Sequence, residues 1–277
     1  EGVRRFIIGL GKKMLIANTV AVPADRIFSM NGGEISAAHA WLGITCYTLQ
    51  IYFDFSSYSD MAIGLGRMFG FRFPENFRWA YIAASVQEFW RRWHISLSNW
   101  FRDYLYVPLG GNRGTSARMY RNLVTVFFLC GLWHGASWNF VVWGLYHGSF
   151  LVAERVGLAA ALKRLWPPLR HLYLILAVMI GWVFFRADSL LGALAYLQAM
   201  AGIGPALPTA FAPAYYLTPE LLLALIAGVL GSMPIGLASD LWRDRLPAAP
   251  ARAFDLTALA ALSLILAASM LQVAAGS

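Results

Sequence analysis

Long apolar runs constrain the fold of this chain more than any other feature of its sequence. A helix needs about 20 residues to cross the hydrocarbon of a bilayer, and seven runs approach that length. Hydrophobic residues make up 59% of the 277 residues and charged residues 13%, so a water-soluble fold would expose large apolar patches. The predicted spans are Ala38–Phe55, Tyr120–Gly135, Phe140–Val156, Leu172–Phe185, Leu221–Leu241 and Leu256–Val273, with a shorter run, Met14–Phe28, that Pro23 and Asp25 interrupt.

The distribution of lysine and arginine supports these spans. With the N-terminus inside and all seven runs crossing, 20 of the 22 basic residues fall on the inner side, and only Arg26 and Arg186 fall outside. Short cytoplasmic loops carry such an excess in multi-pass proteins. The sequence therefore predicts an all-α, polytopic integral membrane bundle. Its net charge of +8 reflects topology and contact with lipid, because no nucleic-acid-binding motif accompanies it.

The inner stretch from Ile63 to Met119 contains an amphipathic segment. Its apolar and polar side chains recur at steps of three and four, which predicts one helix with two faces, ended by Pro108 and the Gly110-Gly111 pair. Such a helix either lies in the interface as an anchor or re-enters the membrane where its polar side is sheltered. The apolar face is Val86, Phe89, Trp90, Trp93, Leu97, Trp100, Phe101 and Tyr104, and the polar face is Gln87, Arg91, His94, Ser98 and Arg102.

His94 favours a functional role for this segment, because an anchor needs cations and has no need of a group that titrates near neutrality.

Two loops complete the non-spanning parts. The loop Leu109–Arg113 is either a simple turn or a cradle whose backbone N–H groups and guanidinium hold a phosphate. The stretch Asp188–Pro219 has no lysine or arginine and is expected to form an outer loop or a helix on the outer surface.

His134 lies at the end of a predicted span, flanked by small residues and tryptophans. Ionisable groups inside a membrane are costly, so they are functional candidates by default. The alternative is a neutral imidazole hydrogen-bonded across helices. A low-dielectric site would keep the ring uncharged and leave a basic nitrogen, as a general base requires. His147, in the next span, is interpreted as a packing or supporting residue.

Three polar residues, Asp54, Ser57 and Asp60, form a cluster at an inner span end. Carboxylates in such a place act as proton relays, ion ligands or partners of basic residues, and the many inner arginines favour pairing. The two cysteines, Cys46 and Cys130, lie in apolar runs and are too few for a disulfide framework or a four-ligand metal site.

Three strings resemble the membrane-bound O-acyltransferase family, in the branch that contains alginate O-acetyltransferase and the D-alanyl transferase of teichoic acids. They are QIYFDFSSYSD at Gln50–Asp60, FWRRWHISL at Phe89–Leu97 with WFRDYLYVPLGGNR at Trp100–Arg113, and LWHGASWNFVVWG at Leu132–Gly144. The resemblance covers roughly Gly2 to Asp188. It implies a helical membrane fold with a thin central layer between a cytoplasmic donor side and an outer funnel.

The resemblance also implies a site. His134 would be the core catalytic histidine and His94 the second histidine of this branch. Residues 1–277 would form a single membrane domain, with core motifs at 50–147 and C-terminal spans at 172–277, of a protein truncated at its N-terminus. Residues expected to bind substrate or line its tunnel are Trp90, Arg91, Trp93, Ser98, Asn99, Arg102, Asp103, Trp133, Trp138 and Asn139.

The activity implied is the transfer of an acyl group, above all acetyl, to hydroxyls of an exported polysaccharide from a bacterial inner membrane. The donor would be a thioester such as acetyl-CoA or an acyl carrier, with no bound cofactor or metal. An extracytoplasmic protein would accept the acetyl group or modify the polysaccharide. D-alanyl transfer to teichoic acid is an alternative. A transporter or flippase, which internal repeats would favour, and an inactive structural subunit are alternatives from other classes.

Overall fold

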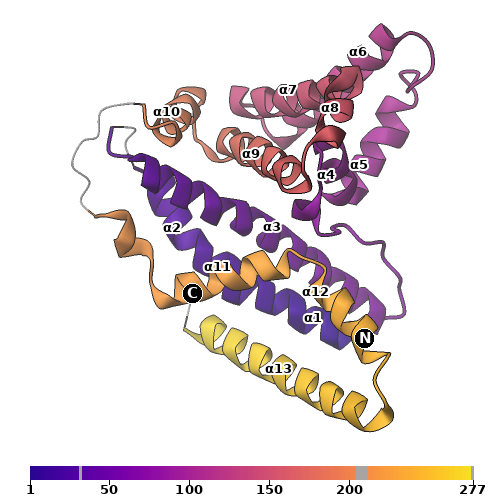
Figure 1. Cartoon of the computed structure of the whole chain (residues 1–277), viewed down its shortest axis with the longest axis vertical. Coiled ribbons are helices and arrows are strands. Elements are labelled where there is room, and N and C mark those ends of the chain that lie inside the picture. The colour runs from indigo at the N-terminus through magenta and orange to yellow at the C-terminus, as the bar shows by residue number, and fades with distance from the viewer. Residues whose placement is uncertain (31–32, 204–210, 276–277) are drawn as a thin grey trace. The chain divides into compact units, whose positions relative to one another are not determined.

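The computed structural model describes residues 1–30, 33–203 and 211–275, and within them every regular element is a helix and no strand occurs (Figure 1). This confirms the predicted all-α fold of a membrane protein. The α-helices are α1 (Gly2–Gly11), α2 (Asn18–Phe28), α3 (Ala37–Met68), α4 (Val86–Arg92), α5 (Ile95–Phe101), α6 (Ser116–His134), α7 (Trp138–Ala153), α8 (Ala159–Arg164), α9 (Pro167–Arg186), α10 (Leu190–Met200), α11 (Pro219–Gly231), α12 (Ile235–Arg243) and α13 (Ala248–Ala274). Three π-helical and two 3₁₀ segments, η1 (Lys12–Ala17), η2 (Ala80–Ile82), η3 (Arg102–Tyr106), η4 (Glu154–Leu158) and η5 (Pro213–Tyr216), join them.

Three helices of the described chain are long and apolar enough to cross a membrane: Gly2–Phe28, Pro167–Arg186 and Ala248–Ala274. Each contains one of the predicted spans. The other predicted spans also fall on helices, but polar residues or short length set them apart. α3 has 32 residues and carries the polar cluster, while α7 has only 16 residues. Helices of this kind need protein neighbours inside a membrane.

The prediction of one continuous span over Leu221–Leu241 is wrong. α11 ends at Gly231, a turn follows over Ser232–Pro234, and α12 begins at Ile235. The physical reason is Pro234, because proline lacks the N–H that a continuing helix needs and its ring disfavours helix in the preceding residue. In the stretch Asp188–Pro219, α10 forms as one helix, and part of the stretch lies outside the described residues.

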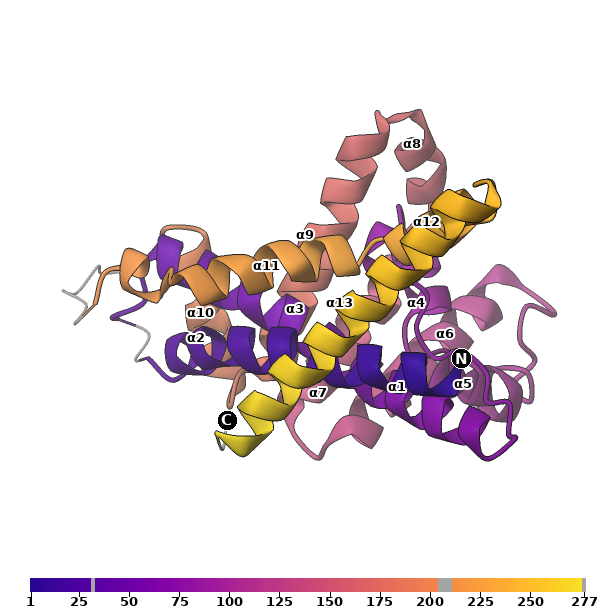
Figure 2. The same cartoon turned by 90° about the horizontal axis from the view of Figure 1, so that it is seen from below.

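The contacts of the chain divide it into two compact units. The first unit consists of Glu1–Pro23, Cys46–Glu75 and Ala214–Ser277. In it α1 packs against α3 through the backbones of Gly2 and Gly64, and α13 runs across α1 (Figures 1 and 2), where Gly11 leaves room for Ile265. The rest of α13 is covered by little protein: Leu264 is 72% exposed and Leu271 is 70% exposed. Side chains this apolar suit contact with lipid.

The second unit consists of Ala24–Thr45 and Asn76–Pro213. Its centre is the hairpin of α6 and α7, on which α9 and the short helix α4 pack. Trp143 of α7, Trp182 of α9 and Phe89 of α4 are among its largest fully buried side chains. Both predicted catalytic histidines and all ten predicted substrate residues belong to this unit.

Candidate active site

His134 is the last residue of α6, where the chain turns toward α7. The two helices approach very closely at a pair of glycines. A Cβ added to Gly131 would collide with the carbonyl oxygen of Phe140, and a Cβ added to Gly144 would collide with that of Phe127. Small residues permit such backbone contact between helices in membranes. The contact therefore fixes where the end of α6 places His134.

The His134 imidazole is half-buried among aromatic rings. The ring centroids of Trp133, Trp143 and Phe185 lie 4.9, 5.0 and 5.1 Å from that of His134, each in an edge-on arrangement. Within the described residues no hydrogen bond reaches either ring nitrogen of His134. A substrate hydroxyl can therefore bond to the imidazole without displacing a protein group.

His94 lies at a break between two helices. The predicted amphipathic helix is not continuous, because α4 ends at Arg92 and α5 begins at Ile95. Between them His94 has φ 44° and ψ 56°, in the left-handed region. This conformation costs a residue with a side chain about 1–3 kcal/mol and persists only where the surroundings impose it. The prediction of a single helix is therefore wrong at the functional candidate itself.

Asn76 imposes this break. Its backbone oxygen accepts a hydrogen bond from the Ile95 N–H at 2.9 Å, and its side-chain Oδ1 accepts one from the Ser96 N–H at 3.1 Å. The same Oδ1 lies 3.3 Å from Nδ1 of His94. Asn76 thus binds the first backbone donors of α5, which a continuous helix would have paired internally. The periodicity of the sequence around His94 cannot reveal a hydrogen-bond partner that lies 18 residues away.

The environment of His94 sets its charge and tautomer. Burial lowers the pKa of His94 to about 4, because a charged imidazole loses its hydration there. The ring is therefore neutral at pH 7. With Asn76 Oδ1 as the acceptor, Nδ1 of His94 carries the proton and Nε2 carries the lone pair.

The two imidazoles lie within electrostatic range of each other. Trp182 of α9 contacts a neighbour of each histidine. Its ring centroid is 5.0 Å from that of Trp93, which precedes His94. It is 5.7 Å from that of Phe185, which contacts His134. A chain of packed aromatic rings therefore connects the surroundings of the two histidines. The structure brings together two histidines that are 40 positions apart in the sequence.

The predicted substrate residues separate into buried and exposed groups. Trp90, Trp93 and Asn139 are packed inside: the indole of Trp90 meets that of Trp143 at 5.7 Å, and Asn139 Nδ2 donates to the Ala187 carbonyl at 2.5 Å. Ser98, partly buried, donates to carbonyl oxygens of α4 and of the break that follows it. Exposed residues are Arg91, Asn99, Arg102, Asp103, Trp133 and Trp138, of which Arg102 and Asp103 form an ion pair at 2.7 Å.

His147 is fully buried beside the candidate site. Its ring centroid lies 5.1 Å from that of Trp90 and 5.3 Å from that of Trp143, and its Nε2 rests against the backbone of Gly181. Neither ring nitrogen has a hydrogen-bond partner among the described residues. This tight packing agrees with the interpretation of His147 as a supporting residue.

The Leu109–Arg113 loop is a turn in which most of the backbone N–H donors are already used. The N–H groups of Gly110, Gly111 and Arg113 bond to the carbonyl oxygens of Val107, Tyr106 and Gly110 at 3.0, 2.8 and 2.9 Å. A phosphate cradle needs such N–H groups to point outward. The geometry therefore favours the simple turn over the phosphate site.

The polar cluster of the first unit pairs with the N-terminal helix. Asp60, which is 6% exposed, accepts hydrogen bonds from Arg5 at 2.8 Å and from Lys12 at 2.7 Å. Asp54 forms an ion pair with Lys13, and the Ser57 hydroxyl donates to the backbone oxygen of Asp54. The carboxylates thus meet basic partners, but these come from the start of the chain and not from the arginine-rich inner stretch.

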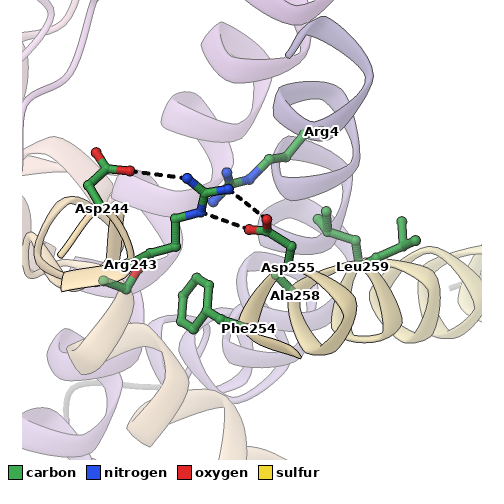
Figure 3. A pocket seen from close by; sticks show the side chains of 9 residues that line it. Arg4, Arg243, Asp244, Phe254, Asp255, Ala258 and Leu259 are labelled. Carbon is green, nitrogen blue, oxygen red and sulfur yellow. Dashed lines mark hydrogen bonds and ion pairs between the residues drawn. The ribbon is translucent and has the colours of Figure 1, made fainter. Parts of the chain in front are cut away.

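A cavity of about 600 Å³ lies in the first unit, between α1, α12 and α13 (Figure 3). Arg243 lines it and pairs with Asp255 at 2.6 Å and with Asp244 at 3.3 Å. Arg4 and Phe254 also line the cavity. Its two arginines and two aspartates balance in charge, and it contains none of the predicted site residues. It therefore does not replace the histidine pair as the candidate active site.

Sequence reasoning missed four residues of the site: Asn76, Trp182, Phe185 and Glu154. Trp182 and Phe185 lie in an apolar helix whose composition gives no sign of a special role. Glu154 did carry a signal, because it is a carboxylate inside a predicted span, and such residues are functional candidates by default. Its side chain is 5% exposed and bonds to the backbone of α4.

Fold and site together define a class of protein. The chain is an all-α membrane protein in which two imidazoles lie within electrostatic range of each other, and packed aromatic rings connect their surroundings. No group of three or more potential metal ligands occurs among the described residues. This arrangement suits general acid–base chemistry on a bound substrate.

The chain belongs to the membrane-bound O-acyltransferase (MBOAT) family, whose model matches residues 2–194. The resemblance inferred from the three motifs is thereby confirmed. The probable alginate O-acetylase AlgI of Azotobacter vinelandii is 54% identical over 190 residues, which are 69% of this chain and 38% of that protein. The peptidoglycan O-acetyltransferase of Helicobacter pylori is 44% identical over 205 residues, 73% of this chain and 39% of that protein.

A more distant relative is the teichoic acid D-alanyltransferase of Bacillus subtilis, 32% identical over 194 residues. That match covers 66% of this chain and 48% of the relative. The chain thus spans between 38% and 48% of the length of these curated relatives.

Proposed function

We propose that this chain carries the acyl-transfer centre of an O-acyltransferase, and that the transferred group is acetyl. The observation that supports this most strongly is the His134 imidazole, which is half-buried, has no hydrogen-bond partner among the described residues and lies within electrostatic range of a neutral His94. Two of the relatives that share this region at 44% and 54% identity are an O-acetyltransferase and an O-acetylase by name. The acceptor would be a hydroxyl of an exported polysaccharide.

In the proposed reaction a thioester donor, such as acetyl-CoA or an acyl carrier, reaches the histidine pair from the cytoplasm. His134 removes the proton from the acceptor hydroxyl while the hydroxyl oxygen bonds to the thioester carbonyl carbon. The carbon–sulfur bond then breaks, and the His134 imidazolium returns the proton to the departing sulfur. The products are an acetyl ester and a free thiol, and general base catalysis of this kind contributes about 10²–10⁴-fold.

His94 would orient the donor. Because its Nδ1–H faces Asn76, its Nε2 offers a lone pair and can accept a hydrogen bond from the donor. A polarising role would require a proton on Nε2, which this tautomer does not provide. Orientation of the reacting groups is itself a large catalytic contribution.

The exposed motif residues Arg91, Asn99, Arg102, Asp103, Trp133 and Trp138 are proposed to contact substrates, and the packed ones, Trp90, Trp93, Ser98 and Asn139, to support the tunnel wall. The setting would be a bacterial inner membrane crossed several times by a single membrane domain. The acetyl group would reach the polymer directly or through an extracytoplasmic partner. D-alanyl transfer is the second candidate, because the D-alanyltransferase relative matches the same region.

The decisive variant is His134→Ala. Acetyl ester on the cell-surface polymer, measured by mass spectrometry, should fall at least 10²-fold because the base is lost, while the amount of protein in the membrane stays the same. Leu132→Ala is the matched control, since Leu132 lies two residues earlier on α6 with an exposed side chain.

Ester levels that persist in His134→Ala cells would remove His134 from the mechanism. D-alanyl ester in place of acetyl ester would identify the second candidate. Movement of the polymer by the purified protein in vesicles, without any ester formation, would assign the chain to the transporters.

A further inference from the structure

Glu154 follows directly after α7 and points its carboxylate at the start of α4. Oε1 accepts a hydrogen bond from the Val86 N–H at 2.7 Å, and Oε2 accepts one from the Gln87 N–H at 3.0 Å. A third bond comes from the hydroxyl of Tyr173 on α9, at 3.1 Å from Oε1. With only 5% of its surface exposed, this carboxylate is held almost entirely by protein donors.

The burial of this carboxylate is compensated at the helix end. A buried charge is costly unless hydrogen bonds replace its hydration, and the first N–H groups of a helix are donors that lack partners inside the helix. The third of these donors, the Glu88 N–H, bonds to Ser85 Oγ at 3.1 Å. Glu154 and Ser85 therefore complete the start of α4, although Glu154 is 68 residues away from Val86 in the sequence.

α4 cannot fix its own position. It has seven residues, and helices this short are unstable without tertiary contacts. Its last residue, Arg92, is followed by Trp93 and by His94 in the left-handed conformation. Any movement of α4 therefore moves His94.

Glu154 also belongs to the structure that holds His134. It continues α7, which packs on α6 through the glycine contact at Gly131 and Gly144. α6 ends at His134. One carboxylate thus connects the helix before His94 to the far end of the hairpin whose turn carries His134, and Tyr173 ties both to α9.

We propose that Glu154 is a positioning residue that sets the distance between His94 and His134, and so the alignment of the donor with the base. This inference rests on the proposed function, because it assigns Glu154 a role in the same site. Glu154 does not touch the reacting atoms; it acts through α4 and His94.

The test compares Glu154→Gln with Tyr173→Phe in the full protein. Glutamine keeps the shape of glutamate but offers one acceptor oxygen, and its NH₂ group faces a backbone N–H. Hydrogen exchange of the α4 amides should therefore rise in Glu154→Gln. Tyr173→Phe leaves both backbone bonds in place, so α4 exchange should change little.

Activity provides a second readout. A displacement of about 1 Å can cost on the order of 10²-fold, so Glu154→Gln should lower kcat/KM for the thioester by about 10- to 100-fold. If Glu154 acts through His94, the loss should largely disappear when Glu154→Gln is added to His94→Ala, because coupled residues are not additive. A merely structural role would give losses that multiply.

Unchanged α4 exchange in Glu154→Gln, or losses that multiply with those of His94→Ala, would overturn the proposal. A second variant, Glu154→Asp, covers the case in which Glu154→Gln does not assemble. It keeps the charge but has a shorter reach, so it should assemble and still raise the hydrogen exchange of α4. Exchange equal to that of the unmodified protein would then overturn the proposal. Hydrogen exchange reports on the contact between Glu154 and α4 independently of the reaction that the protein catalyses. A protein that shows the exchange effect but retains acetyl transfer in His134→Ala would refute the proposed function and leave the contact established.

Discussion

At the scale of single residues, the candidate site depends on imidazoles that stay neutral. His94 is the example, because burial lowers its pKa to about 4. In the unfolded chain a histidine titrates near pH 6.5. Between these two pH values, therefore, the histidine at position 94 binds a proton in the unfolded chain but stays neutral in the folded chain.

This difference gives stability a predictable dependence on pH. As the pH falls from about 6.5 toward 4, the unfolded state takes up a proton at position 94 and the folded state does not, so folding stability should decrease. His94→Gln removes the contribution of this group and should make the dependence less steep over the same window, because other buried histidines still contribute. Thermal unfolding of the detergent-solubilised protein at several pH values would measure both. An equally steep dependence in the variant would show that another group is responsible.

The hydrogen bonds of the folded chain distinguish between alternatives that the sequence left open for the polar cluster and for the glycine loop. The polar cluster of Asp54 and Asp60 pairs with lysine and arginine, as the abundance of basic residues indicated. The phosphate cradle at Gly110 and Gly111 is disfavoured because the loop uses its own N–H groups. Composition identified the kinds of residue involved, but the identity of each partner came from the structure.

At the scale of elements, the α6–α7 hairpin is the rigid base of the site. Its glycines permit an approach at which any side chain would collide with backbone. Backbone cannot rotate away as a long side chain can, so the helices would have to separate. His134, three residues after Gly131, would move with the end of α6.

Gly144→Ala tests this hairpin. The added methyl group would meet the Phe127 carbonyl oxygen, and overpacking of this kind typically costs about 1–3 kcal/mol. Both the melting temperature and the rate of acetyl transfer should fall. Gly236→Ala is the control, because a Cβ at Gly236 on α12 meets nothing within 4 Å. If the two variants behave alike, the glycine contact does not position the site.

The two breaks in predicted helices have different origins. The break between α11 and α12 follows from Pro234, which is visible in the sequence. The break at His94 depends on Asn76, whose oxygens bind the first donors of α5. The first was open to prediction from local chemistry, whereas the second needed knowledge of a tertiary contact.

At the scale of the whole molecule, apolar runs and basic residues together predict a multi-pass chain with its arginine-rich stretch inside. Within the described part of the chain, three helices have the length and composition to cross a membrane. The two native cysteines, Cys46 and Cys130, are buried. A single cysteine introduced at an exposed position would therefore be the reactive one.

Cysteine labelling tests the predicted orientation. Leu191→Cys lies on α10, beyond the outer end of a predicted span, and its position is 79% exposed. It should react with a membrane-impermeant thiol reagent in intact spheroplasts. Ser116→Cys, exposed at the start of α6, should react only after the membrane is opened. The reverse pattern would invert the topology and place the donor side on the opposite face.

Composition and periodicity are enough to predict the membrane class and most of the helices, and the cost of placing an ionisable group in hydrocarbon makes His134 a candidate, which the family motifs extend to His94. The pairing of distant groups emerges from the folded chain alone: Asn76 with Ser96 and His94, Glu154 with Val86, and Arg5 with Asp60. This difference follows from the range of the interactions. A helix forms from interactions within four residues, whereas a buried carboxylate or a left-handed histidine is stable only where distant parts of the chain supply its partners.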